Sequence, residues 1–163
     1  TRLSPAMRPS VVTMRVWPND LDTNAHMNNR RYLTLMDLGR FDLMTQCGLV
    51  GVVLRQRWFP IAGGVMVRFE RPLHAFEKIT LKSSILGWDD KWLYFRHDIL
   101  TGDSRAARAT ARGLFRTRGQ SVPTADLLDA MNYDGAPIPP PDSVRQWIHA
   151  DELMREEDEQ SST

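Results

Sequence analysis

Hydrophobic and polar positions change their period within the first fifty residues of the chain. Residues 10–17 alternate and include β-branched side chains, which predicts a strand that Pro18 terminates. From residue 29 the apolar positions recur at steps of three and four, which predicts a helix over residues 29–47 with Gly48 at its C-terminal side. A glycine inside a helix costs about 1 kcal/mol relative to alanine. Gly39 therefore indicates that the helix backbone closely approaches a sheet at this point.

Alternation returns after residue 60 and predicts a run of antiparallel strands, following an irregular or briefly helical stretch over residues 49–60. Asp89-Asp90 and Gly102-Asp103 predict hairpin turns within this run. A last strand is predicted over residues 104–118, with small or apolar side chains at odd positions and arginine at many even positions. The small side chains should face the helix, and the arginines should face outward. The three strands before it alternate on Val65, Val67 and Phe69, on Ile79, Leu81 and Ile85, and on Leu93, Phe95 and Ile99.

The last forty residues read as a helical extension. Pro123 opens a short helix over residues 124–131, and a proline-rich loop follows. A terminal helix is expected from Asp142 to about Glu157, and the tail from Asp158 is expected to fray. We therefore divide the chain into a first domain, residues 1–122, and a C-terminal extension with an acidic tail, residues 123–163. The apolar stripe of the terminal helix consists of Val144, Trp147, Ile148 and Leu153.

The order of these elements is strand, long helix, then four consecutive antiparallel strands. One central helix can bury its apolar side chains only if a single sheet curls around it. The sequence therefore predicts an α+β architecture that resembles the hotdog fold.

Bulk composition fits one soluble globular domain of 163 residues, with 42% hydrophobic and 25% charged residues. No apolar run approaches the length of a membrane span, and no secretory signal is visible near the start. The single cysteine, Cys47, excludes an internal disulfide and suits a reducing cytoplasm, so a cytoplasmic location is expected.

The net charge of +1 conceals an asymmetry. Residues 151–159 carry −5, and the first 150 residues therefore carry +6, most of it arginine. Such arginines either form a solvated surface or bind a phosphate-bearing ligand, since guanidinium groups match phosphate well. The candidates for phosphate contacts are Arg68, Arg71, Arg112, Arg116 and Arg118.

A dense polar cluster precedes the predicted long helix. It places two carboxylates, three carboxamides and an imidazole within ten positions: Asp20, Asp22, Asn24, His26, Asn28 and Asn29. One or two such residues suffice to cap a helix or to form an Asx-turn. Six exceed that need and indicate a site.

This cluster has the composition of an acyl-transfer site. The first-turn N–H groups of a helix and its dipole favour developing negative charge. The carboxylate of Asp22 can attack a carbonyl carbon or activate water, and His26 can orient or exchange a proton with its neighbours. No other signal competes: metal-ligand spacing, a Gly-x-Ser-x-Gly elbow, a phosphate-binding loop and a nucleic-acid module are all absent from the sequence.

The spacing Asp20-Leu21-Asp22-x-Asn24-x-His26-x-Asn28-Asn29-x-x-Tyr32 resembles the signature of hotdog-fold thioesterases. It is similar to the thioesterase-like branch of the 4-hydroxybenzoyl-CoA thioesterase-like family and to the plant acyl-ACP thioesterases. A second patch, residues 86–95, also resembles that branch. Together with the strand order, the resemblance spans roughly residues 10–120.

The resemblance implies hydrolysis of an acyl-CoA or acyl-carrier-protein thioester to a free acid and a thiol, as part of lipid metabolism. It implies a homodimer or a dimer of dimers with active sites at the subunit interface, and no metal or cofactor beyond the coenzyme A of the substrate. By position, Asp22 matches the catalytic nucleophile or general base, with Asn24 and His26 beside it. The backbone N–H of Asn29 matches the group that polarises the carbonyl. Asn28 and Tyr32 complete the expected substrate contacts.

One departure and two alternatives remain. Plant enzymes add a Glu or Cys about 35 residues after the His, whereas residues 58–67 here contain neither. A hotdog enoyl-CoA hydratase or dehydratase would show Asp-x-Asn-Pro-x-His, but His26 falls one residue early and the proline is missing. A non-catalytic acyl-CoA-binding protein is the other alternative.

Overall fold

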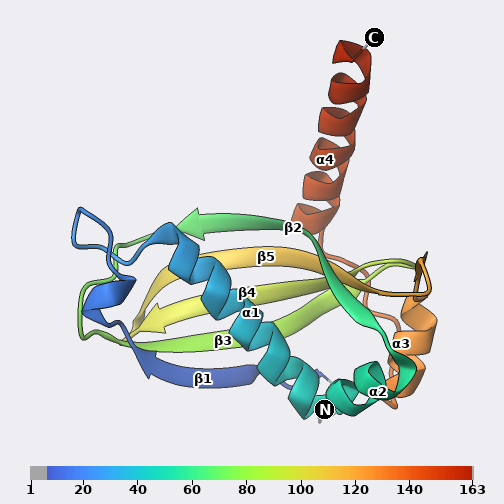
Figure 1. Ribbon diagram of the computed structural model, residues 1–163, viewed down its shortest axis with the longest axis horizontal. Coiled ribbons are helices and arrows are strands. Elements are labelled where there is room, and N and C mark those ends of the chain that lie inside the picture. The colour runs from blue at the N-terminus through green and yellow to red at the C-terminus, as the bar shows by residue number, and fades with distance from the viewer. Residues whose placement is uncertain (1–6, 163) are drawn as a thin grey trace.

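A single antiparallel sheet curls around one long helix in the computed structural model, which describes residues 7–162 (Figure 1). The strands lie in the order β1 (Ser10–Arg15), β3 (Lys78–Trp88), β4 (Leu93–Thr101), β5 (Ser104–Thr117) and β2 (Phe59–Phe69), and β6 (Gln120–Ser121) pairs with β5. Helix α1 (Asn29–Gln46) crosses the concave face. The predicted α+β architecture, one sheet around a central helix, is confirmed. The remaining elements are η2 (Pro18–Asp20), α2 (Leu49–Gln56), α3 (Thr124–Ala130) and α4 (Asp142–Ser161).

Strand neighbours follow the chain only in part. Strands β3, β4 and β5 pair consecutively, whereas β2 pairs with β5 at the sheet edge and not with β3, the next strand along the chain. Strand β2 also begins at Phe59, earlier than the alternation of Val65 to Phe69 predicts. Its register with β5 shifts between Ala62 and Gly64, and this irregularity interrupts the period of two that makes a strand visible in sequence.

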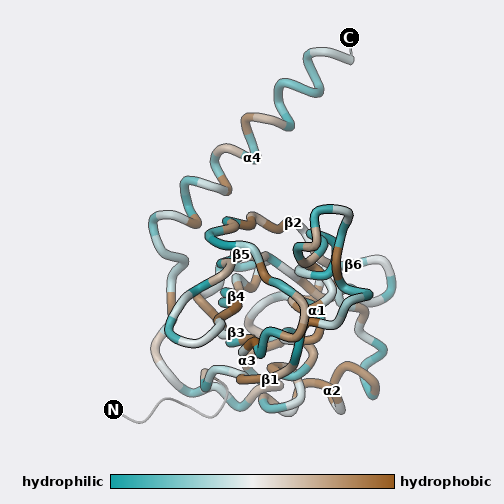
Figure 2. Tube along the Cα trace, turned by 90° about the vertical axis from the view of Figure 1, so that its left-hand side faces the viewer, coloured by the Kyte–Doolittle hydropathy of each residue, from teal (hydrophilic) through white to brown (hydrophobic). Residues whose placement is uncertain are grey.

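The helix boundaries agree with the sequence at α1 and differ at α4. Helix α1 ends at Gln46, and Gly48 follows with a left-handed φ of 73°, as the cap pattern predicts. Helix α4 continues to Ser161, so the expected fraying from Asp158 is wrong. Only Val144 of its apolar stripe is buried, and Leu153 is 45% exposed. Beyond its base α4 projects from the domain and is mostly hydrophilic (Figure 2).

The C-terminal extension contributes to the main core. Leu127 of α3 and Met131 after it are buried in the same cluster as Phe95 and Phe115 of the sheet. The expected boundary between residues 122 and 123 therefore crosses a continuous hydrophobic core.

Helix α1 lies close to the sheet because the facing side chains are small. Ala107, Ala109 and Ala111 of β5 are buried with at most 1% exposure, which confirms the thin inward face of this strand. On the helix, Gly39 sits directly above Ser83 of β3, where a methyl group would collide with Ser83 Oγ and lie 3.0 Å from Leu81 Cδ2. The expected packing reason for Gly39 is confirmed.

A polar pair is enclosed beneath this contact. Ser83 Oγ and His97 Nδ1 are 2.8 Å apart, and both residues have no exposed surface. Burial, and then the positive charge of Arg40, lower the pKa of His97 to about 3. His97 is therefore neutral in the folded protein at physiological pH.

We expect Gly39→Ala to lower the free energy of unfolding by about 1–3 kcal/mol, because the added methyl overpacks the helix–sheet contact. Gly51→Ala in α2 is the matched control, since nothing lies within 4 Å of its added methyl; it should raise stability by about 0.4–1 kcal/mol. Urea unfolding of both variants measures the two effects. Equal changes in the free energy of unfolding of the two variants, or a Gly39→Ala variant more stable than the wild type, would contradict the packing argument.

His97 also predicts a pH dependence of stability. Between the ordinary pKa of 6.5 and the folded value of about 3, the unfolded chain binds a proton that the folded protein excludes. Stability is therefore fully present above pH 6.5 and falls below it, by up to about 1.4 kcal/mol per pH unit from this group. His97→Gln should flatten the slope of unfolding free energy against pH, while His149→Gln on exposed α4 should not. Identical slopes in the two variants would rule His97 out as the source.

Candidate functional site

The polar cluster folds into a compact loop between β1 and α1. Leu21 and Met27 form an antiparallel bridge that closes it, and the N–H of Asp22 donates to the carbonyl of His26 at 2.8 Å. Ala25 turns the chain with a left-handed φ of 59°. The N–H of Met27 donates to the carbonyl of Leu73 at 2.8 Å, which ties the loop to the segment after β2.

The Asp22 carboxylate organises this loop through one of its oxygens. Oδ1 accepts from the N–H of Asn24 at 2.9 Å and from the N–H of His26 at 3.3 Å. Within residues 7–162, Oδ2 has no such donor. Asp22 is exposed, so this oxygen faces a region that a ligand can reach. The Asx-turn and a chemical role are therefore compatible, because each uses a different oxygen.

Asn28 and Asn29 form the entrance of α1. Asn28 is the N-cap: its Oδ1 accepts from the N–H of Arg30 at 2.9 Å, and its own N–H donates to the carbonyl of Asp20 at 2.8 Å. Asp20 also pairs with Arg31 at 3.0 Å, so its role is to fix the turn. Asn29 is the first residue of α1, and its N–H has no intrahelical acceptor. A backbone donor thus stands at the helix end, seven residues after Asp22.

His26 and Tyr32 point toward the segment that follows β2. The His26 ring meets the His74 ring edge to face, with centroids 5.1 Å apart. Tyr32 is buried at 2% exposure against Phe69, with ring centroids 5.0 Å apart, which is a core position. Burial and the nearby charge of Glu77 raise the pKa of Tyr32. His74 and Glu77 therefore adjoin the site, although they lie about fifty residues from it in sequence and carry no motif.

Glu77 is tied into the structure by several donors. It accepts from the Thr101 hydroxyl at 3.0 Å and from the N–H of His74 at 3.1 Å. These bonds occupy both oxygens in holding the segment around residue 74 beside the loop. Glu77 is thus an acid near His26, outside the stretch in which the plant pattern places one.

An apolar cavity of about 400 Å³ lies at the other end of α1. Phe41 and Met44 of α1, Val53 and Leu54 of α2, and Ile61 and Phe115 of the sheet are among its lining residues. Its first lining residue on α1 is Asp37, about 12 Å along the helix from Asn29 at 1.5 Å per residue. Within one chain the cavity and the polar loop are therefore separate.

Several other sequence candidates have structural partners. Burial raises the pKa of the Cys47 thiol to about 11, so this cysteine behaves as a small hydrophobe. In the hairpin patch, Asp89 accepts from the N–H of Trp92 at 2.7 Å and from the Tyr94 hydroxyl at 2.6 Å, which shapes the turn. Among the described residues no group of His, Cys, Asp and Glu could hold a metal ion, and none of the described helices is long and apolar enough to cross a membrane.

The candidate arginines are already engaged to different degrees. Arg112 pairs with Asp151 at 2.6 Å and stacks on Trp92, while Arg68 pairs with Glu70 at 2.9 Å. Arg71 reaches Glu77 at 3.5 Å, Arg116 donates to the carbonyl of Gly119, and Arg118 lies in the turn before β6 with a left-handed φ of 49°.

Comparisons with known proteins agree with this geometry. The protein THEM6 of Drosophila melanogaster is 28% identical over 131 residues, which are 78% of this chain and 65% of that protein. THEM6 of Xenopus laevis is 37% identical over 79 residues, 48% of this chain and 38% of that protein. The chain thus spans less than two thirds of the length of these curated relatives.

Solved structures share the fold. The 4-hydroxybenzoyl CoA thioesterase from Pseudomonas sp. strain CBS-3 superposes with a TM-score of 0.68 at 18% identity, over 76% of this chain and 99% of that one. This confirms the hotdog architecture. A family model described as the thioesterase-like superfamily matches residues 16–148, which include the polar loop, α1 and every strand except β1. The family resemblance is therefore confirmed, and the chain belongs to the thioesterase-like superfamily.

Proposed function

We propose that this protein hydrolyses an acyl thioester, with acyl-CoA or acyl-carrier protein as the substrate class. The observation that carries the proposal is an exposed Asp22, with no hydrogen-bond donor to Oδ2 among residues 7–162, in the loop that leads directly into the donor end of α1 at Asn29. A carboxylate beside backbone N–H groups suits attack on a carbonyl whose oxygen gains negative charge. Membership of the thioesterase-like superfamily supports the same reaction.

The proposed reaction needs water, the Asp22 carboxylate and the backbone N–H of Asn29. With Asp22 as general base, the carboxylate takes a proton from water as the hydroxyl oxygen bonds to the thioester carbon. The Asn29 N–H stabilises the oxyanion, the C–S bond breaks, and the proton passes from Asp22 to the departing thiolate. With Asp22 as nucleophile, the carboxylate bonds to the thioester carbon, and the C–S bond breaks to release the thiolate and leave a mixed anhydride. Water then cleaves the anhydride, which frees the acid, restores the Asp22 carboxylate and supplies the proton for the thiolate. Asn24, His26 and Asn28 hold the loop in both versions.

The acyl group requires an apolar site, and the cavity at the far end of α1 provides one in a second copy of the chain. Tyr32 packs on Phe69, so the polar loop before α1 lies at the end of β2. The cavity is instead lined by Pro60 and Ile61, at the beginning of β2. Strand β2 is the edge of the sheet. Antiparallel pairing of two β2 edges would bring the loop of one copy to the cavity of the other. We therefore propose a homodimer with two composite sites.

The exposed side chains of β2 support this dimer. Phe59 is 65% exposed, Ile61 41%, Met66 43% and Phe69 48% on one edge strand. Phe41 of α1, beside the cavity, is 58% exposed. A long apolar edge with unpaired backbone groups is a surface that natural proteins cover.

Asp22→Asn should lower kcat/KM for acyl-CoA hydrolysis by about 10²–10⁴-fold. The amide retains an oxygen that accepts from Asn24 and His26, so the loop persists while the charge is lost. Asp20→Asn is the control, since its carboxylate serves only the turn and a partly buried ion pair with Arg31; it should keep activity within about fivefold. Thiol release from acyl-CoAs of increasing length and an aromatic one measures both.

Unchanged activity in Asp22→Asn would remove this carboxylate from the mechanism. Absence of thiol release from every substrate by the wild type, with measurable coenzyme A binding, would identify a non-catalytic binding protein. Hydration of an enoyl-CoA in place of thiol release would identify a hydratase.

The composite site predicts complementation between two inactive variants. Ile61→Trp should fill the cavity and abolish turnover while the loop stays intact. When Ile61→Trp and Asp22→Asn are mixed and allowed to exchange subunits, heterodimers contain one site with an intact loop and an intact cavity. Random exchange should therefore restore about a quarter of wild-type activity. No recovery after proven exchange would show that loop and cavity belong to one chain or do not cooperate.

A further inference from the structure

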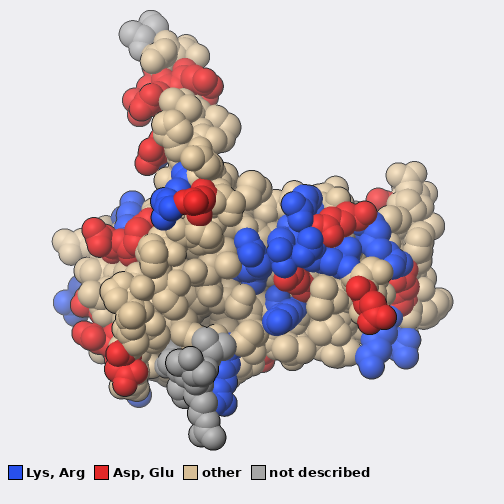
Figure 3. Space-filling view, turned by 180° about the vertical axis from the view of Figure 1, so that it is seen from behind, with Lys and Arg blue, Asp and Glu red and all other residues tan. Residues whose placement is uncertain are grey.

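The outer face of the sheet carries a concentrated positive charge. Five basic side chains from four strands gather there, with only Glu70 and Asp98 between them, and they form a band in Figure 3. We call this set the arginine face; its basic members are Lys82 of β3, Arg96 of β4, Arg105 and Arg108 of β5, and Arg68 of β2.

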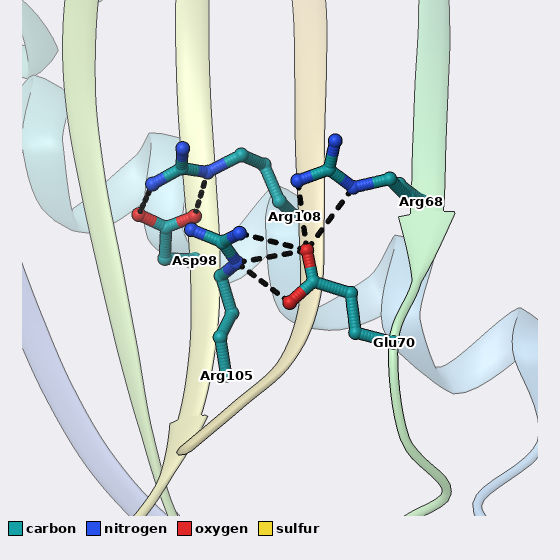
Figure 4. Close-up of polar contacts among 5 residues, drawn as sticks. All are labelled: Arg68, Glu70, Asp98, Arg105 and Arg108. Atoms are coloured by element: carbon teal, nitrogen blue, oxygen red, sulfur yellow. Dashed lines mark hydrogen bonds and ion pairs between the residues drawn. The ribbon is translucent and has the colours of Figure 1, made fainter. Parts of the chain in front are cut away.

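Internal ion pairs leave this face positive. Glu70 is shared by Arg68 at 2.9 Å and Arg105 at 2.8 Å, and Asp98 binds Arg108 at 2.6 Å and 2.8 Å (Figure 4). The two acids pair with three of the five cations, and the five cations exceed the two acids by a formal +3. Arg68 and Arg108 lie directly opposite each other in the β2–β5 register, an arrangement of like charges that costs free energy.

Arg96 shows that the surplus is not compensated within the chain. Its Nε is buried and has no acceptor among the described residues. Burial, and then the positive charges of Arg108, Arg105 and Arg68, lower the pKa of its guanidinium, with Asp98 opposing the shift. An anionic group placed over this face would relieve both the repulsion and the missing hydrogen bond.

The end of α4 has the opposite charge. Residues 152–161, which we call the acidic arm, carry five acids against Arg155 alone, and all of them are exposed. Acids in the last turns of a helix oppose its dipole, and this helix has no basic residue in its last turn. An unpacked segment of this length is marginal as a helix in water. A basic partner would stabilise the helical form of the acidic arm.

The base of α4 fixes the direction of the acidic arm. Asp151 pairs with Arg112 on the outer face of β5, and the Arg112 guanidinium lies 4.8 Å from the Trp92 ring and 5.7 Å from the Trp147 ring. From this anchor α4 extends past β2, the edge of the sheet (Figures 1 and 2). The acidic arm therefore cannot reach the arginine face of its own chain while this base is intact.

We propose that the acidic arm of each copy lies across the arginine face of the other copy in the dimer. This inference rests on the β2-to-β2 dimer of the proposed function. In Figure 3 the acidic arm rises above the sheet edge at the upper left, and the band of basic residues lies below that edge at the right. A twofold axis through the paired β2 strands carries each arm onto the other copy's band.

The dimensions agree with this arrangement. The acidic arm extends about 10–15 Å past Asp151, and strands are spaced by about 4.8 Å. Two spacings from β5 reach the second copy's β2, which carries Arg68, and three reach its β5, which carries Arg108. A pairing centred on Met66 would set Gly64, beside the α4 base, opposite Arg68 of the other copy. The same pairing sets Pro60 opposite residue 72 and Ile61 opposite residue 71, next to the polar loop of the other copy.

Two acids on opposite sides of α4 give a matched test. Asp158 continues the seam of Val144, Trp147, Asp151 and Met154, at steps of three and four residues, and so faces the second copy in this arrangement. Glu156, two residues earlier, lies on the opposite side of the helix from this seam. We expect Asp158→Lys to raise the dimer dissociation constant about fivefold in sedimentation equilibrium, and Glu156→Lys to change it less than about twofold, because charges a helix diameter apart are screened. The difference should shrink between about 50 and about 300 mM salt.

Equal dissociation constants for the two variants in a dimeric protein would overturn the arm contact and leave the dimer standing. A monomeric wild type would overturn the dimer itself. A photoreactive residue in place of Ser161 tests which copy the acidic arm contacts. The dimers for this experiment contain one isotope-labelled and one unlabelled chain. Cross-links from one copy to peptides of the other that contain Arg68 or Arg108 are expected. Cross-links confined to one copy would show that the arm folds onto its own chain and would overturn the proposal.

Discussion

The close contact between α1 and the sheet is the constraint on which the rest of this molecule depends. Gly39 on the helix lies against Ser83 and Leu81 of β3, and its missing side chain removes the volume that would otherwise hold the two layers apart. The helix can then bury Tyr32, Leu35 and Leu43 within one curled sheet. Because interiors are packed as densely as crystals, a single added methyl group at this contact must displace its neighbours.

That packing decides where the functional groups lie. With α1 fixed against β1, β3 and β4, its first turn projects a backbone donor at the edge of the sheet, beside the loop that Asp22 organises. Its second half stands away from β2 and β5, and the space between is the apolar cavity. The polar chemistry and the apolar pocket are therefore at opposite ends of one helix, which a single copy cannot join.

The uncovered edge at β2 connects these observations. Four features of the structure meet at this edge. They are the exposed apolar side chains of β2, the cavity at the start of β2, the polar loop at its end and the direction of α4 past it. One twofold pairing across this edge would complete the site and bring opposite charges together. The part of α4 beyond residue 148, which includes the acidic arm, lies outside the matched family region.

Local signals in the sequence sufficed for much of the fold. The period-3.6 pattern and Gly48 located α1, the alternating strands from Ile79 to Phe115 located β3, β4 and β5, and the dense polar run before Asn29 located the loop. These features are encoded by neighbours within a few residues, where periodicity and capping operate. The extent of β2 was not visible, because a register shift and glycines break its alternation.

Tertiary structure alone decided which distant segments meet. Nothing local pairs β2 with β5, sets His74 and Glu77 beside His26, or buries His97 next to Ser83, since strand order and long-range contacts are selected by packing of the whole core. The sequence by itself determined the elements, the charge asymmetry and the chemistry available at Asp22. Only the folded chain placed the cavity away from that chemistry, because this follows from how α1 is seated in one curled sheet. Only the folded chain also aimed the acidic arm past the sheet edge, because Arg112 anchors the base of α4 on the outer face of β5.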